Sequence, residues 1–175
     1  MGNDEQLNLD FHVEQTAWGK WVDPERRAAQ ARKFMEYAGL QQLPAQPWPE
    51  GSPEVKRIDP LVAALFPDMA TAMAPENADK VDAFICFMGE CFIKYAGAKW
   101  FDEEWFGREF TFYDKVTPAL LIDDHDEDVE TAWGLMRRMI EHDPEVYSGM
   151  YSYFAAALRE YATYHQEKRG KATSA

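Results

Sequence analysis

The strongest hydrophobic pattern in the chain lies between Pro75 and Trp100. Apolar side chains recur there at spacings of three and four residues, which places them on one face of an α-helix. They are Val81, Phe84, Ile85, Met88, Cys91, Phe92 and Tyr95. Gly97 stands where a left-handed residue commonly ends a helix. The pattern therefore predicts a mostly buried central helix around which the other elements pack.

One helix and one irregular connection are predicted ahead of it. Asp23 is suited to cap a helix from Pro24 to Ala38, which Gly39 would end. Residues 40–53 contain several prolines and a glycine, so we expect an extended connection across the surface. We expect residues 1–15 to form a loosely ordered N-terminal end.

Residues 54–73 predict a helical region that is broken at Pro60 and again at Pro67. Its apolar residues would face the core. This region leads into the central helix.

The period of the pattern changes after Gly97. Phe110 and Phe112 alternate with Thr111 and Tyr113, which is typical of a half-buried strand, and a further extended piece is expected at 119–122. So small a sheet is not stable by itself, so it must lie on helices.

Two more helices are predicted in the last third of the chain. Asp124 would open a helix that runs through His142, and Asp143 would cap another with Pro144 in its first turn. Residues 168–175 predict a flexible C-terminal end. The whole pattern indicates the α+β class: a mostly helical single domain, residues 1–175, with a small antiparallel β-hairpin packed on helices.

The cysteines indicate a reducing compartment. Cys86 and Cys91 lie five residues apart on the predicted helix, roughly 7 to 8 Å along its axis, which is too far for a disulfide. The polar N-terminus lacks the features of a secretory signal, and the chain has no apolar run long enough to span a bilayer. We therefore expect a cytoplasmic protein without a membrane partner.

Charge restricts the partners more than it restricts the fold. The chain has 31 acidic residues against 18 lysines and arginines, a formal net charge of −13. Such a chain repels nucleic-acid backbones and attracts basic proteins. The same acidity also serves solubility alone, so charge by itself does not prove a partner.

The motifs of common catalytic sites are missing from the sequence. The acidic run after Ile122 resembles a calcium loop, but Val129 and Leu135 occupy the places of the required glycine and glutamate. The lone Glu90 on the central helix is a candidate for acid or base chemistry, but such a carboxylate is more often paired with an arginine or placed at the wet edge of the helix. The sequence therefore predicts a protein that is not an enzyme, with no catalytic residue, metal ligand or cofactor.

An interaction surface is the remaining candidate site. Two acidic segments, one with adjacent aromatic rings, would form a negative zone if the hairpin lay near the start of the following helix. The predicted partner-binding residues are Asp102, Glu103, Glu104, Trp105, Phe106, Asp123, Asp124, Asp126, Glu127 and Asp128. The alternative is that the aromatic rings are core residues.

The stretch MGECFIKYAGAKWF, from Met88 to Phe101, resembles a helix-to-strand turn found in small acidic bacterial immunity proteins of toxin–immunity systems. The resemblance covers 14 residues and includes no catalytic residue. It implies a protein that neutralises a basic protein partner by occlusion. Three alternatives stay open: a phage-type inhibitor that mimics nucleic acid, a small metal-dependent enzyme that uses Glu90 or the Asp123 to Asp128 cluster, and an oligomerising scaffold.

Overall fold

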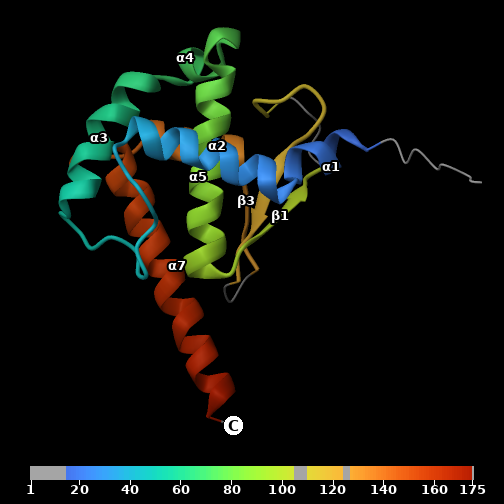
Figure 1. Cartoon of the computed structure of the whole chain (residues 1–175). Coiled ribbons are helices and arrows are strands. Elements are labelled where there is room, and N and C mark those ends of the chain that lie inside the picture. Colours follow the sequence, from blue (N-terminus) through green and yellow to red (C-terminus); the bar gives the residue numbers. More distant parts are fainter. Residues whose placement is uncertain (1–14, 105–109, 124–126, 175) are drawn as a thin grey trace, which may run out of the picture.

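The structure is a computed structural model that describes residues 15–104, 110–123 and 127–174. The chain forms one mostly helical domain with a small antiparallel sheet (Figure 1). The α+β class predicted from the sequence is thus confirmed. The prediction of loose order at the N-terminal end falls on residues outside these ranges, apart from Gln15.

Helix α5, Ala78–Ala96, is the centre of the fold, and the 3₁₀ turn η1, Pro75–Asn77, precedes it. It is buried along most of its length, as its apolar pattern predicts. Gly97 ends it with a φ of 66°, a left-handed conformation that costs glycine little. The predicted central helix is confirmed.

Helix α2, Pro24–Tyr37, crosses α5 and follows the short helix α1, Ala17–Val22 (Figure 1). The Asp23 side chain accepts a hydrogen bond from the Arg26 N–H at 3.0 Å, which confirms the predicted N-cap. The Phe34 ring lies 4.7 Å from both Phe84 and Phe87, centroid to centroid, so aromatic packing joins the two helices.

Helix α3, Pro53–Leu65, runs through Pro60, so the predicted break at that residue is wrong. Ile58 and Val62 flank Pro60 and are fully buried, and their packing outweighs the lost backbone hydrogen bond. The break predicted at Pro67 does occur, because this residue lies between α3 and α4, Met69–Met73.

The sheet consists of β1, Lys99–Asp102, β2, Pro118–Leu121, and β3, Val129–Thr131, in the order β1-β2-β3. The extended piece predicted at 119–122 is confirmed as β2. The strand predicted at 110–113 is wrong. Thr111 accepts a hydrogen bond from the Tyr113 N–H and donates one to the Val116 carbonyl, and these bonds hold the segment in a turn.

Helix α6, Ala132–Ile140, begins eight residues later than the predicted start at Asp124. Residues 129–131 pair with β2 instead, which excludes a helical backbone there. Thr131 caps α6 by accepting the Gly134 N–H at 2.9 Å, and Thr16 caps α1 through Gly19 in the same way at 3.0 Å. The sequence TAWG is therefore a local capping motif at both sites.

Helix α7, Met150–Thr173, begins after the predicted cap at Asp143, so that prediction is also wrong. Its N-terminus is capped by Asp59 of α3, which accepts hydrogen bonds from the Ser152 backbone at 2.8 Å and from the Ser152 hydroxyl at 2.5 Å. A Cβ at Gly149 would lie 2.4 Å from the Asp59 carboxyl carbon. The helix start thus depends on a residue distant in sequence.

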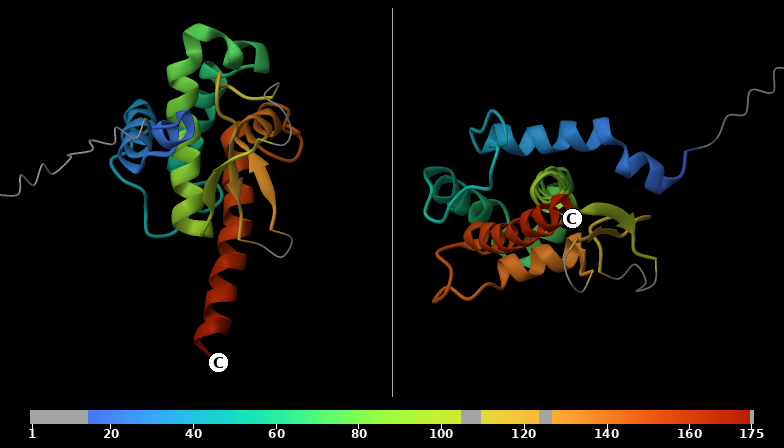
Figure 2. Two further views of the ribbon diagram at one scale, coloured as in Figure 1. Left: turned by 90° about the vertical axis from the view of Figure 1, so that its right-hand side faces the viewer. Right: turned by 90° about the horizontal axis from the view of Figure 1, so that it is seen from below.

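The sheet lies beside α7, whose C-terminal end projects beyond the rest of the domain (Figure 2). Residues 168–173, predicted as a flexible end, continue α7 with exposed side chains. Among the described residues, none of the helices combines the length and the apolar character that crossing a bilayer requires.

The contact between α5 and β1 predicts an asymmetric effect of two glycine substitutions. A Cβ at Gly89 would lie 2.2 Å from Trp100 Cζ2, so Gly89→Ala should destabilise the fold by about 1 to 3 kcal/mol through overpacking. A Cβ at Gly170 in α7 would meet no atom within 4 Å beyond its own helical backbone and its chain neighbours, so Gly170→Ala should stabilise the fold by about 0.5 to 1 kcal/mol. Urea unfolding measures both, and equal effects would contradict the packing of Trp100 on Gly89.

Candidate partner-binding site

The two predicted acidic segments lie at opposite ends of the sheet. Asp102 pairs with Pro118 at one end, whereas Asp123 follows Leu121, which pairs with Lys99 at the other. Asp123 stands five residues beyond Pro118, so in an extended chain the two acidic segments lie roughly 16 Å apart. The described members therefore do not form the single negative zone that we expected. The strand register determines this separation, and the sequence alone did not predict that register.

At the first end, two of the three acidic residues form hydrogen bonds with the backbone of Thr117. Asp102 accepts a hydrogen bond from the Thr117 N–H at 2.7 Å. Glu103 is only 9% exposed, and its N–H donates to the Thr117 carbonyl at 2.8 Å. Glu104 is exposed. Trp105 and Phe106 lie outside the described residues, so their predicted role as anchors stays a prediction.

At the other end, Asp123, Glu127 and Asp128 border the connection between β2 and β3. Glu127 is exposed and has a φ of 51°. Asp128 is partly buried, and its carbonyl accepts the Ile122 N–H at 2.9 Å, which closes the hairpin. Asp124 and Asp126, also predicted here, lie outside the described residues.

Helix α7 fixes the position of Asp123. The carboxylate contacts Lys168 Nζ at 2.5 Å and His165 Nδ1 at 3.0 Å. The hydrogen bond from Lys168 is the main cause that lowers the pKa of Asp123. His165 in turn lies over Gly97, where a Cβ would lie 2.5 Å from its ring. The end of α5, the hairpin and α7 therefore meet at this carboxylate.

Two exposed apolar side chains accompany these acids. Leu121 and Val129 pair across β2 and β3, with exposed fractions of 39% and 45%. A hollow of about 280 Å³ next to them is lined by Gly97, Lys99, Leu121, Ile122, Asp123 and Glu127. We call Leu121, Asp123, Glu127, Asp128 and Val129 the acidic sheet end. Sequence reasoning missed its apolar part, because β2 and β3 are too short to show a period.

A buried ion network, which sequence reasoning also missed, lies between α2 and α5. Asp82 is 6% exposed. Its carboxylate accepts from Arg26 at 2.5 Å, Gln30 at 2.5 Å and the Tyr113 hydroxyl at 2.6 Å. Burial is the main cause that raises the pKa of Tyr113 well above its usual value, and the negative charge of Asp82 raises it further. The network is structural, because it links α2, α5 and the segment ahead of β2 through one carboxylate.

The candidates for chemistry have structural partners as well. Glu90 forms an ion pair with Arg27 at 2.9 Å. Cys86 and Cys91 are free and buried, and burial is the main cause that raises the pKa of the Cys86 thiol to about 12. Among the described residues, no group of three or more His, Cys, Asp and Glu side chains could hold a metal ion.

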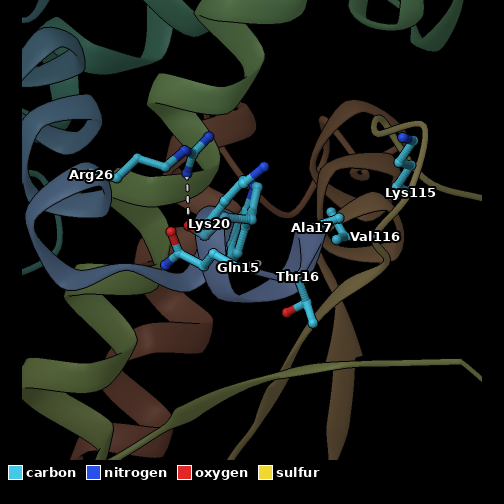
Figure 3. Close-up of a pocket in the computed structure, with 8 residues that line it drawn as sticks. Gln15, Thr16, Ala17, Lys20, Arg26, Lys115 and Val116 are labelled. Atoms are coloured by element: carbon cyan, nitrogen blue, oxygen red, sulfur yellow. Dashed lines mark hydrogen bonds between the residues drawn. The ribbon is translucent and has the colours of Figure 1, made fainter. Parts of the chain in front are cut away.

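Another pocket, of about 720 Å³, has the opposite charge (Figure 3). Lys20 and Arg26 line one side and Lys115 the other, and Arg26 donates to the Trp21 carbonyl at 3.0 Å. Cations in this position would repel a basic partner. We therefore place the candidate site at the acidic sheet end.

Comparisons with protein-family models, with curated proteins and with solved structures found no match to this chain. The resemblance of residues 88–101 to immunity proteins therefore stays a prediction.

The burial of Asp82 predicts a large effect of its neutralisation. Asp82→Asn removes the charge that pairs with Arg26, and we expect a loss of about 3 kcal/mol, the lower end for a broken buried pair because Arg26 is partly exposed. Asp79→Asn is the control, since its pair with Lys33 is exposed and should contribute less than about 0.5 kcal/mol. Urea unfolding compares the two, and equal losses would show that burial does not strengthen the Asp82 pair.

The raised thiol pKa predicts sensitivity to alkali. The Cys86 pKa moves from 9.0 to about 12 on folding, so its contribution to stability is complete below pH 9 and is lost as the pH rises towards 12. The free energy of unfolding should therefore decline above pH 9, and less steeply in Cys86→Ala. Parallel declines in both proteins would contradict the assigned role of this thiol.

Proposed function

We propose that this protein is a cytoplasmic binding protein that neutralises a basic protein partner by occluding it, of which an immunity protein of a toxin is the most concrete form. One observation supports the proposal most strongly: the acidic sheet end combines carboxylates with the exposed pair Leu121 and Val129. Apolar contacts supply affinity at such a surface, while the charges supply encounter rate and specificity.

The remaining charge and redox features agree with this proposal. A net charge of −13 raises the encounter rate with any basic protein. Buried free thiols on α5 suit a reducing compartment, which supports the cytoplasmic location. Mechanistically, the protein needs no chemistry of its own, because the bound surface blocks the site that the partner uses.

Charge reversal at the two ends of the sheet tests the proposal. Immobilised protein is exposed to extract of the source cells at low salt, and we expect a basic protein that elutes at high salt. Glu127→Lys should lower the association rate of that protein about fivefold through weaker steering. Glu104→Lys is the matched control, because this exposed glutamate lies at the opposite end.

Inhibition completes the test. A stoichiometric amount of the wild-type protein should block the activity of the captured partner. An acidic partner, or binding that does not weaken as the salt concentration rises, would contradict the proposal. Loss of binding in Glu104→Lys alone would place the site at the first end of the sheet. Displacement of the partner by DNA would instead support the inhibitor that mimics nucleic acid.

A further inference from the structure

A second hollow lies next to the acidic sheet end, on the side of α7. It encloses about 350 Å³ and is lined by Asp128, Tyr147, Tyr153, Ala156, Ala157, Glu160 and Tyr161. Tyrosine rings and carboxylates therefore converge here from the β2–β3 connection, from the α6–α7 connection and from α7. Neither the net charge nor the sequence pattern predicted this group.

The floor of the hollow follows from the side chains of α7. Ala156 and Ala157 are small, whereas Tyr153 and Tyr161 stand eight residues apart, about 12 Å along the helix axis. The two rings thus border a trough over two helical turns. Its length accommodates one extended long side chain.

The wall at one end is held in place by local hydrogen bonds. The Asp143 carbonyl accepts the N–H groups of Val146 and Tyr147 at 3.1 and 3.0 Å, which fixes the turn that presents Tyr147. The Tyr147 and Tyr153 rings meet at 89° with their centroids 5.1 Å apart, so they form a corner. A pocket formed in advance binds with a smaller entropic cost.

The other end carries negative charge. Glu160 is exposed and forms no ion pair with the described residues. Asp128 accepts a hydrogen bond from the Tyr161 hydroxyl at 3.3 Å and lines the hollow together with Glu160. Two carboxylates beside tyrosine rings suit a planar cation, which can donate to the oxygens and stack on the rings.

We propose that this hollow binds one arginine side chain of the basic partner, with the guanidinium between Asp128 and Glu160 and the alkyl stem over the two alanines. The inference rests on the proposed function and assigns the anchor of that interface. Arginine fits better than lysine, because its planar group uses two carboxylates and an aromatic face together.

The test uses short peptides and the full chain. A blocked Gly-Arg-Gly peptide is titrated into protein with labelled alanine methyl groups, and saturable NMR shifts are expected at Ala156 and Ala157. The same peptide with neutral citrulline should give none. Glu160→Gln should weaken arginine binding about fivefold, in the range of a charge-assisted contact. Glu167→Gln is the control, because this exposed glutamate lies two helical turns further along α7.

A steric variant separates this inference from the proposed function. Ala157→Leu fills the trough without a change of charge, so it should abolish the methyl shifts at Ala156 and weaken capture of the basic partner at least tenfold. The arginine pocket would be overturned if the arginine peptide gave no shifts, or if the citrulline peptide or a matching Gly-Lys-Gly peptide gave equal shifts. Unchanged capture by Ala157→Leu would overturn its role as anchor while the neutraliser stands. Peptide binding without any basic partner would remove the proposed function and leave only a guanidinium pocket.

Discussion

The buried carboxylate of Asp82 is the constraint on which the arrangement of this domain depends. It lies on the most buried helix, so its charge is tolerated only with donors on every side. Arg26 and Gln30 supply them from α2 and Tyr113 from the segment between β1 and β2. This side chain thereby ties α2 and the segment ahead of β2 to α5, in addition to the aromatic packing of Phe34 on α5. That contact helps to hold the sheet against α5, together with the packing of Trp100 on Gly89.

The acidic residues of this protein divide into two groups with different roles. Asp59 caps α7, Asp82 joins two helices, Glu90 pairs with Arg27, and Asp102 holds the Thr117 backbone. These carboxylates serve the fold, and net charge alone does not distinguish them from the others. Glu127 and Glu160 are exposed, and they flank the same corner of the molecule between the β2–β3 connection and α7. Exposed Glu127 lies beside the exposed pair Leu121 and Val129, which is the reason we assign partner binding to this end of the sheet.

Helix α7 connects the fold to the proposed interface. Its N-terminus is capped by α3, its middle forms the floor of the tyrosine-lined hollow, and its last turns hold Asp123 through His165 and Lys168. A partner that covers the acidic sheet end would contact α7 as well. The two hollows would then act together, with apolar contact at Leu121 and Val129 and a cation anchored near Glu160.

The sequence by itself determined α5, α2, β2 and the fold class, because a helix that buries a long apolar stripe or has a local cap needs no distant information. Gly97 and Asp23 are such local signals. Tertiary structure decided the rest. Asp59 set the start of α7, pairing with β2 turned residues 129–131 into a strand, and packing carried α3 through Pro60. It also separated the two acidic segments and brought Glu160 beside Asp128, because strand register and helix packing depend on contacts between residues far apart in the chain.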